Sequence, residues 1–184
     1  YAVTVPWVVY SDLVVDGVEG PQAVCPGTVA PDGGTPDSGA PDAGAGPGTE
    51  HSVLQDVTAA SWESGVYPLV DDLNGEGPSG GSQGSVIYLK FPAVGGTPGR
   101  AILKLHTSTI AGARGGSGRI CHVDDDSWSE DTLTWANRPA VSGICAGNSM
   151  TVDADQEVEF DVTSIVGGPA NENLAIVSSD QDGV

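Results

Sequence analysis

The chain has 184 residues, of which 39% are hydrophobic, enough for one domain with a modest core; its 27 glycines and 13 prolines favour short strands and loops over helices. Its formal net charge is −19, because 25 acidic residues face only six basic ones. This charge makes nucleic acid and anionic membranes poor partners, since nothing would offset repulsion by their phosphates, and it disfavours tight binding of an acidic polysaccharide for the same reason.

The first ten residues predict a β-strand, because apolar side chains recur at every second position. The residues that share this face are Val3, Val5, Trp7 and Val9. Pro6 has no amide hydrogen to donate, so we expect the strand to lie at a sheet edge or to bulge there. A second short strand is predicted from Leu13 to Val18. We treat residues 1–30 as an N-terminal strand segment.

The chain begins at Tyr1 rather than Met, and no basic stretch precedes its first apolar residues. We therefore expect a mature product whose signal peptide has been removed, which places the protein outside the cell or at the cell surface. No apolar run reaches the ~20 residues that a membrane-spanning helix needs, so we predict no membrane span.

Residues 31–48 form a low-complexity segment in which units of the type Pro-Asp-x-Gly recur. The segment holds no large apolar side chain, so it cannot contribute to a core and is predicted to be an extended linker. In polyproline conformation, at ~3.1 Å per residue, it would reach roughly 55 Å. Thr35 and Ser38 lie near proline and small residues, which makes them candidates for O-glycosylation, whereas the chain contains no Asn-x-Ser/Thr sequon.

Residues 49–184 are predicted to form an all-β domain, because short apolar runs alternate with loops rich in Gly, Ser and Pro. The expected strands are His51–Val57, Val86–Phe91, Ala101–Thr107, Arg119–Val123, Thr151–Val152, Val158–Val162 and Leu174–Ser178. Lys90 and Lys104 interrupt apolar runs on one face, as in a half-buried antiparallel strand. Asp161 is expected to cap a short helix that ends at Val166. The whole pattern favours a jelly-roll-like antiparallel β-sandwich with an extended N-terminal strand and a Pro/Gly-rich linker.

The three cysteines are Cys25, Cys121 and Cys145, and none has the Cys-x-x-Cys spacing of a zinc or redox site. Cys121 and Cys145 both lie in strand-like sequence in the compact part of the chain. We therefore predict a disulfide between them, worth about 3 kcal/mol in the chain-entropy model. Cys25 would then be free or joined to another chain. The alternative is three reduced, buried thiols.

Three stretches carry a family resemblance. They are Ala101-Ile-Leu-Lys-Leu, Asp125-Asp-Ser-Trp-Ser-Glu-Asp-Thr-Leu-Thr-Trp-Ala-Asn-Arg-Pro-Ala and Phe160-Asp-Val-Thr-Ser. Together they resemble the DNRLRE domain, a group similar to carbohydrate-binding module family 96, over about residues 50–184. The resemblance implies a secreted jelly-roll sandwich of the kind found on bacterial surface proteins and polysaccharide-processing enzymes. Some relatives bind polysaccharide, and many have no known role.

The chain departs from that group at its end, because members normally continue past the position of Val184 into a closing apolar strand. A sandwich without that strand would expose core side chains and an unpaired edge. We hypothesise that residues 1–10 fill the vacant edge, either within their own chain or in a neighbouring copy, as in donor-strand complementation. Donation between copies that does not close on itself generates a filament.

The leading function prediction is therefore a secreted structural subunit that assembles with copies of itself into an extracellular filament or surface layer through its N-terminal strand. The alternative is a carbohydrate-binding module whose partner is a polysaccharide, acting as a surface adhesin or as a fragment of a polysaccharide-processing enzyme. A third interpretation is that the chain is a proteolytic or partial fragment, which would explain its abrupt end without assembly.

Aromatic side chains are the candidates for stacking on sugar rings. Trp128 and Trp135 lie in the family motif, and we expect both to serve the core rather than to bind sugar. Trp62 and Tyr67 lie in a loop-like stretch and are better candidates for an exposed glycan platform, with packing or a subunit contact as the stronger alternative for them.

Asp124 and Asp126, in a run of three aspartates, are candidate calcium ligands because Ca²⁺ prefers carboxylate oxygens. The run lacks the spacing of an EF-hand loop, so a solvated acidic turn is the alternative. We expect no other cofactor. We also predict that the protein is not an enzyme, since its histidines are scattered and it has no Gly-x-Ser-x-Gly nucleophile elbow.

Overall fold

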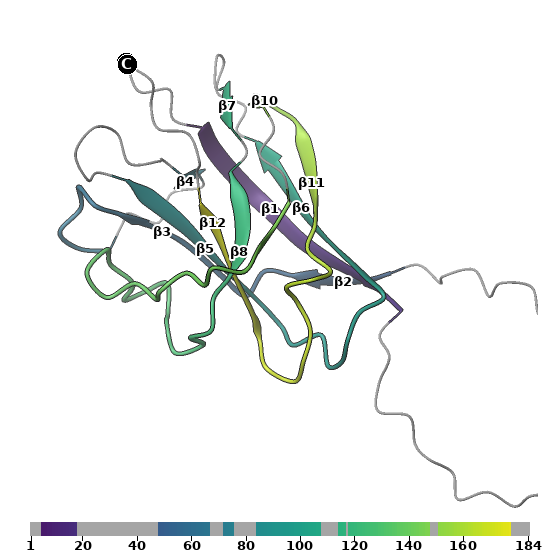
Figure 1. Cartoon of the computed structure of the whole chain (residues 1–184). Coiled ribbons are helices and arrows are strands. Elements are labelled where there is room, and N and C mark those ends of the chain that lie inside the picture. Colours follow the sequence, from purple (N-terminus) through teal and green to yellow (C-terminus); the bar gives the residue numbers. More distant parts are fainter. Residues whose placement is uncertain are drawn as a thin grey trace, which may run out of the picture.

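The computed structural model shows an all-β protein made of two packed antiparallel five-stranded sheets and a separate two-stranded ribbon, β7 with β10, which confirms the predicted β-sandwich (Figure 1). The structure describes residues 5–17, 48–66, 72–75, 84–107, 114–116, 118–147 and 151–177. Within these ranges there is no helix, and hence none long and apolar enough to cross a membrane. The strands are β1 Val5–Asp16, β2 Thr49–Ser52, β3 Gln55–Ala60, β4 Asp72–Gly75, β5 Ser85–Phe91, β6 Arg100–Thr107, β7 Arg114–Gly116, β8 Arg119–His122, β9 Cys145–Ala146, β10 Thr151–Asp153, β11 Glu157–Asp161 and β12 Glu172–Val177.

The first sheet has the order β11-β6-β1-β2, and β4 also pairs with β1. The two strands predicted within residues 1–18 are one continuous strand with β6 on one side and β4 and β2 on the other. The prediction of an edge position was therefore wrong. The ladder to β6 begins at Trp7, so the missing amide hydrogen of Pro6 removes no bond from it, and the ladder slips farther on, between Val8 and Asp12.

The strand predicted to serve assembly is thus paired within its own chain. Val5 and Trp7 both pair with β4, and Val9 belongs to β1 as well. Val3 lies outside the described residues, and so do the side chains of residues 5–11. The apolar face that these four residues are expected to share stays a prediction.

The second sheet has the order β3-β5-β12-β8-β9, and its inner face packs against the first sheet. Alternate residues of β5 and β12, such as Leu89 and Ile176, point into this interior and join Leu13, Leu103 and Phe160 of the first sheet. Each of these five side chains is at most 1% exposed. Burial of side chains of this size stabilises the fold by about 1.5–3 kcal/mol each, so this core holds the two sheets together.

The prediction of a single strand from His51 to Val57 was wrong, because the structure contains two strands there. β2 belongs to the first sheet and β3 to the second, so the chain crosses between the sheets at Val53 and Leu54. Leu54 already pairs with the second sheet, since its N–H donates to the Lys90 carbonyl at 2.7 Å. A pattern of apolar residues does not reveal such a crossing, because both halves have strand-like sequence.

The helix predicted from Asp161 to Val166 is a turn in the structure. The Asp161 carboxylate accepts hydrogen bonds from the Thr163 N–H and hydroxyl, as a helix cap would. The Thr163 hydroxyl also accepts from the Ala101 N–H, and the Val162 N–H donates to the Ala101 carbonyl. The start of this segment is therefore bonded to the start of β6, and the Ile165 N–H donates to the Val162 carbonyl to close a single turn.

The predicted division into residues 1–30, 31–48 and 49–184 stays a prediction, because residues 18–47 lie outside the described part of the chain. β1 nevertheless shares one sheet and one core with the strands that follow. The predicted free or intermolecular thiol and the O-glycosylation candidates also lie outside the described residues; they are Cys25, Thr35 and Ser38.

Candidate functional site

The outer face of the second sheet carries a continuous row of side chains that are mostly small or apolar. Cross-strand register places them side by side from β3 to β9; they are Val57, Tyr88, Ala175, Cys121 and Cys145. Residues 124–144, here named the cover segment, contain no strand and follow β8 as the green segment in Figure 1. Trp128 and Leu133 of this segment pack on Tyr88 and close a second, smaller core.

Trp128 is the anchor of the cover segment. Its side chain is buried, and its ring lies 5.9 Å from the Tyr88 ring at an angle of 59°. Its indole N–H donates to the Asn173 amide oxygen at 3.0 Å. The predicted core role of Trp128 is confirmed, and Trp135 is partly buried against the same cluster.

Lys90 is a buried cation beneath the cover segment, with 7% of its surface exposed. Its ammonium donates hydrogen bonds to the carbonyl oxygens of Asp126 and Trp128, at 2.9 and 2.7 Å. The Asp126 carboxylate lies 3.4 Å from the same ammonium and accepts hydrogen bonds from Asn171 and Asn173. Desolvation opposes ionisation of Asp126, but these hydrogen bonds and the Lys90 charge outweigh it and lower the pKa of the carboxyl. The charge of Lys90 is therefore compensated locally, as burial requires.

The two candidate calcium ligands have different partners. A carboxylate oxygen of Asp124 lies 3.2 Å from the ring of His122, whereas Asp126 is engaged by Lys90 and two asparagines. In the part of the chain that the structure describes, no three His, Cys, Asp or Glu side chains are grouped so that they could hold a metal ion. Calcium binding at Asp124 and Asp126 stays a prediction.

Next to this anchor the outer face forms a groove with a volume of about 550 Å³. Strands β5, β12 and β8 supply its floor through Val86, Tyr88, Val177 and Arg119. Residues 138–143 at the end of the cover segment supply its wall. The groove therefore has a floor that is apolar except for Arg119, and a wall supplied by the cover segment.

Arg119 and Arg138 both line the groove, although the whole chain has only six basic residues. The guanidinium carbon of Arg138 lies 3.4 Å from the centroid of the Trp135 ring, and Nη1 of Arg138 donates to the Trp135 carbonyl. The aromatic contact and this hydrogen bond order the guanidinium beside the groove.

Tyr88 has a structural rather than a ligand-binding hydroxyl. The hydroxyl donates to the Pro139 carbonyl at 2.8 Å and so ties the sheet to the wall of the groove. Burial raises the pKa of Tyr88 to about 12, against the opposing effect of the Arg138 charge. The phenol therefore stays protonated, and remains a donor, at neutral pH.

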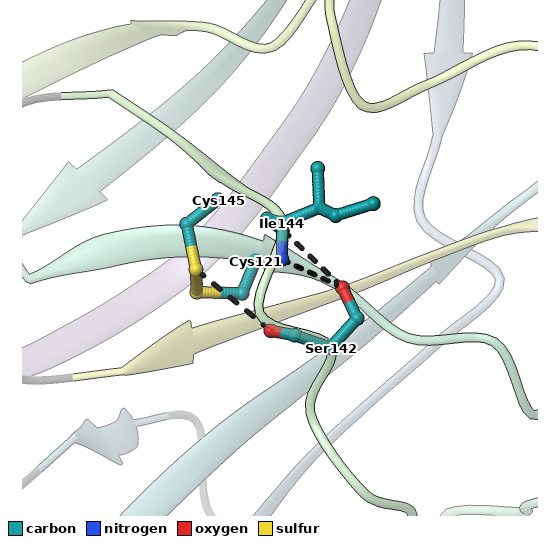
Figure 2. Close-up of a disulfide and its surroundings, with 4 residues drawn as sticks. All are labelled: Cys121, Ser142, Ile144 and Cys145. Atoms are coloured by element: carbon teal, nitrogen blue, oxygen red, sulfur yellow. Dashed lines mark hydrogen bonds between the residues drawn. A yellow bond between two sulfur atoms is a disulfide. The ribbon is translucent and has the colours of Figure 1, made fainter.

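The predicted Cys121–Cys145 disulfide is confirmed, and both cysteines line the groove. Figure 2 shows how the cover segment returns to it: the Ile144 N–H donates to the Ser142 hydroxyl, and the Cys145 sulfur lies 3.9 Å from the Ser142 carbonyl oxygen. Strand β9 has only two residues, so the disulfide fixes this end of the wall against β8. The alternative of three reduced thiols is excluded.

The predicted glycan platform does not coincide with the groove. Trp62 is 38% exposed in the turn after β3 and is not among the groove-lining residues, and Tyr67 lies outside the described residues. Sequence reasoning missed Arg119 and Arg138 as site residues. Their rarity in an acidic chain was the available signal, but the sequence does not show that the two lie together.

The family model for carbohydrate-binding module family 96 matches residues 73–183, which is more than half of the chain. The matched range contains β5, β8, β12, the cover segment and thus all residues that line the groove. No curated protein matches the chain. The match agrees with the resemblance that the Trp128 motif carries, and the chain therefore belongs to carbohydrate-binding module family 96.

Proposed function

We propose that the protein binds a polysaccharide in the groove between the second sheet and the cover segment. The family supports carbohydrate as the ligand class, and the placement of Arg119 and Arg138 in the groove is the observation that supports this site. An extracellular location is compatible with the disulfide, since such bonds persist in oxidising compartments. The absence of catalytic activity stays a prediction.

The groove offers two kinds of contact that suit a sugar chain. Val86 and Val177 present apolar surface on which the C–H face of a sugar ring could pack. Arg119 and Arg138 supply N–H donors for ring and hydroxyl oxygens, and the guanidinium of Arg138 is already ordered by Trp135. Because this ordering precedes binding, less conformational entropy is lost when the ligand arrives.

Replacing Arg119 with alanine is expected to weaken polysaccharide binding by about tenfold, the equivalent of ~1.4 kcal/mol, through loss of a charged hydrogen-bond donor from the groove floor. Affinity electrophoresis against soluble neutral and uronate-containing polysaccharides measures this change. Arg100→Ala is the matched control, because Arg100 is an exposed residue of β6 that does not line the groove. The control should migrate like the wild type on every gel.

Two results would contradict the proposal. The first is that no polysaccharide in the panel retards the wild-type protein. The second is that a polysaccharide does retard it, but Arg119→Ala and Arg100→Ala reduce the retardation equally.

Comparison of neutral with uronate-containing polysaccharides also shows whether the two groove arginines overcome the repulsion of acidic sugars that is expected from the net charge of −19.

Assembly into a filament or surface layer, with copies of the chain as partners, is a separate proposal that rests on β1. This twelve-residue strand pairs with β2, β4 and β6, so a neighbouring copy could use the same three ladders if strands were exchanged. Negative-stain microscopy of native material should then show regular polymers, and deletion of residues 1–10 should leave monomers. Dispersed full-length monomers, or polymers that persist after the deletion, would rule this assembly out.

A further inference from the structure

Lys90 and Asn173 face each other directly across the two central strands of the second sheet. The Lys90 carbonyl accepts from Leu54 of the β3 side, and the Asn173 carbonyl accepts from Val123 of the β8 side. Their backbone groups therefore point away from one another, so they form a non-hydrogen-bonded pair. In such pairs the Cα atoms are about 4.5 Å apart and the side chains are closest.

Both side chains lie on the outer face beneath Trp128, and both are buried, at 7% and 2% exposure. The Asp126 carboxylate bridges them: the same oxygen lies 3.4 Å from the Lys90 ammonium and accepts from the Asn173 amide NH₂ at 3.1 Å. On its other side the Asn173 amide oxygen accepts from the Trp128 indole at 3.0 Å. A nucleophile and the amide that carries the leaving group thus share one carboxylate as a proton acceptor, and the amide oxygen already has a hydrogen-bond donor.

We propose that Lys90 and Asn173 become joined by an intramolecular isopeptide bond after the chain has folded. Asp126 takes a proton from the Lys90 ammonium, and the neutral Nζ attacks Cγ of Asn173. The new Nζ–Cγ bond forms and the Cγ–Nδ2 bond breaks. Asp126 passes to the departing nitrogen first this proton and then the second proton that Nζ loses as the amide forms, so the nitrogen leaves as an ammonium ion. The step needs no oxidant, cofactor or second substrate, and it is independent of polysaccharide binding.

Each neighbouring group lowers a barrier to this otherwise slow reaction. The fold places the amine and the amide on paired residues of neighbouring strands and on the same carboxylate oxygen, and intramolecular placement of this kind can supply effective concentrations on the order of 10⁵–10⁸ M. The Trp128 N–H stabilises negative charge as it develops on the amide oxygen. Asp126 is ionised at neutral pH and so can accept the proton. The product would covalently link β5 to β12 at the centre of the sheet.

Intact-mass measurement on the folded, full-length protein tests the proposal after reduction of the disulfide. The wild type should be lighter than its sequence by the mass of one ammonia molecule, and a proteolytic digest should contain a branched peptide that joins residues 90 and 173. Asp126→Ala should keep the full sequence mass, because the proton acceptor is gone. Asp125→Ala is the matched control, since this neighbouring carboxylate is exposed and bonds to Ser127.

The wild-type mass alone decides whether the bond exists, so the test does not depend on whether every variant folds. A mature wild-type protein with its full sequence mass would overturn the proposal. Loss of one water instead, with a branched peptide that joins residues 90 and 126, would also overturn it, because the lysine would then have reacted with the carboxylate. Unchanged ammonia loss in Asp126→Ala would overturn the role of Asp126.

Discussion

Trp128→Ala is expected to lower the free energy of unfolding by about 3–5 kcal/mol, the range for removal of a large aromatic side chain from a core. The indole contacts Tyr88 and donates a hydrogen bond to Asn173. The Lys90 ammonium lies over the indole ring, 4.6 Å from the ring centroid. Alanine keeps none of these contacts, so the smaller core loses its centre and the Asn173 amide oxygen loses its donor. Urea unfolding followed by far-UV circular dichroism measures the change.

Trp62→Ala is the matched control, because it removes the same side chain from a position that is 38% exposed. Its effect should stay within about 0.5 kcal/mol, as for most surface substitutions. Trp128→Phe should fall between the two, since it keeps much of the ring packing but leaves the buried Asn173 oxygen unpaired, at a cost of about 1–3 kcal/mol. Equal losses of unfolding free energy for Trp128→Ala and Trp62→Ala would show that Trp128 does not anchor the cover segment.

The contrast between Lys90 and Lys104 shows how far strand periodicity can be trusted. Both were interpreted as polar interruptions on the face of a half-buried strand. Lys104 fits that interpretation, because it is partly exposed and lies 3.7 Å from the Glu159 carboxylate. Lys90 does not, because the cover segment lies over its face of the sheet and buries it. Alternation of apolar and polar residues distinguishes the two faces of a strand, but it does not show which other part of the chain covers each face.

Local signals predicted the disulfide, the core role of Trp128 and most strands of the compact part within one or two residues. Contacts between distant elements escaped prediction. The sequence predicted that the N-terminal segment contributes a strand, yet it could not show that β2 and β4 would flank that strand and move it inside the sheet. The groove escaped for the same reason, because Arg119 and Arg138 come from a strand and from a loop that only the tertiary fold brings together.

Replacing Cys121 and Cys145 together with serine is expected to lower the free energy of unfolding by about 3 kcal/mol, because the bond closes a loop with a sequence separation of 24 residues. We also expect polysaccharide binding to weaken by about tenfold. Without the bond, the two-residue strand β9 and the adjoining wall of the groove must be ordered by the ligand, and ordering one or two side chains costs about 1.4 kcal/mol. Both measurements are best made with Cys25→Ser as the background, so that no third thiol can exchange with the pair.

The control separates lost stability from lost order in the groove. Val57→Ala removes buried volume from the same sheet at a residue that does not line the groove, so it should lower stability while binding stays close to wild type at temperatures where the protein is folded. If the disulfide only stabilises the fold, the double serine variant will behave like Val57→Ala in the binding assay. If the disulfide positions the wall, the double serine variant will bind more weakly than Val57→Ala even when both are fully folded, because the loss then lies in the groove itself.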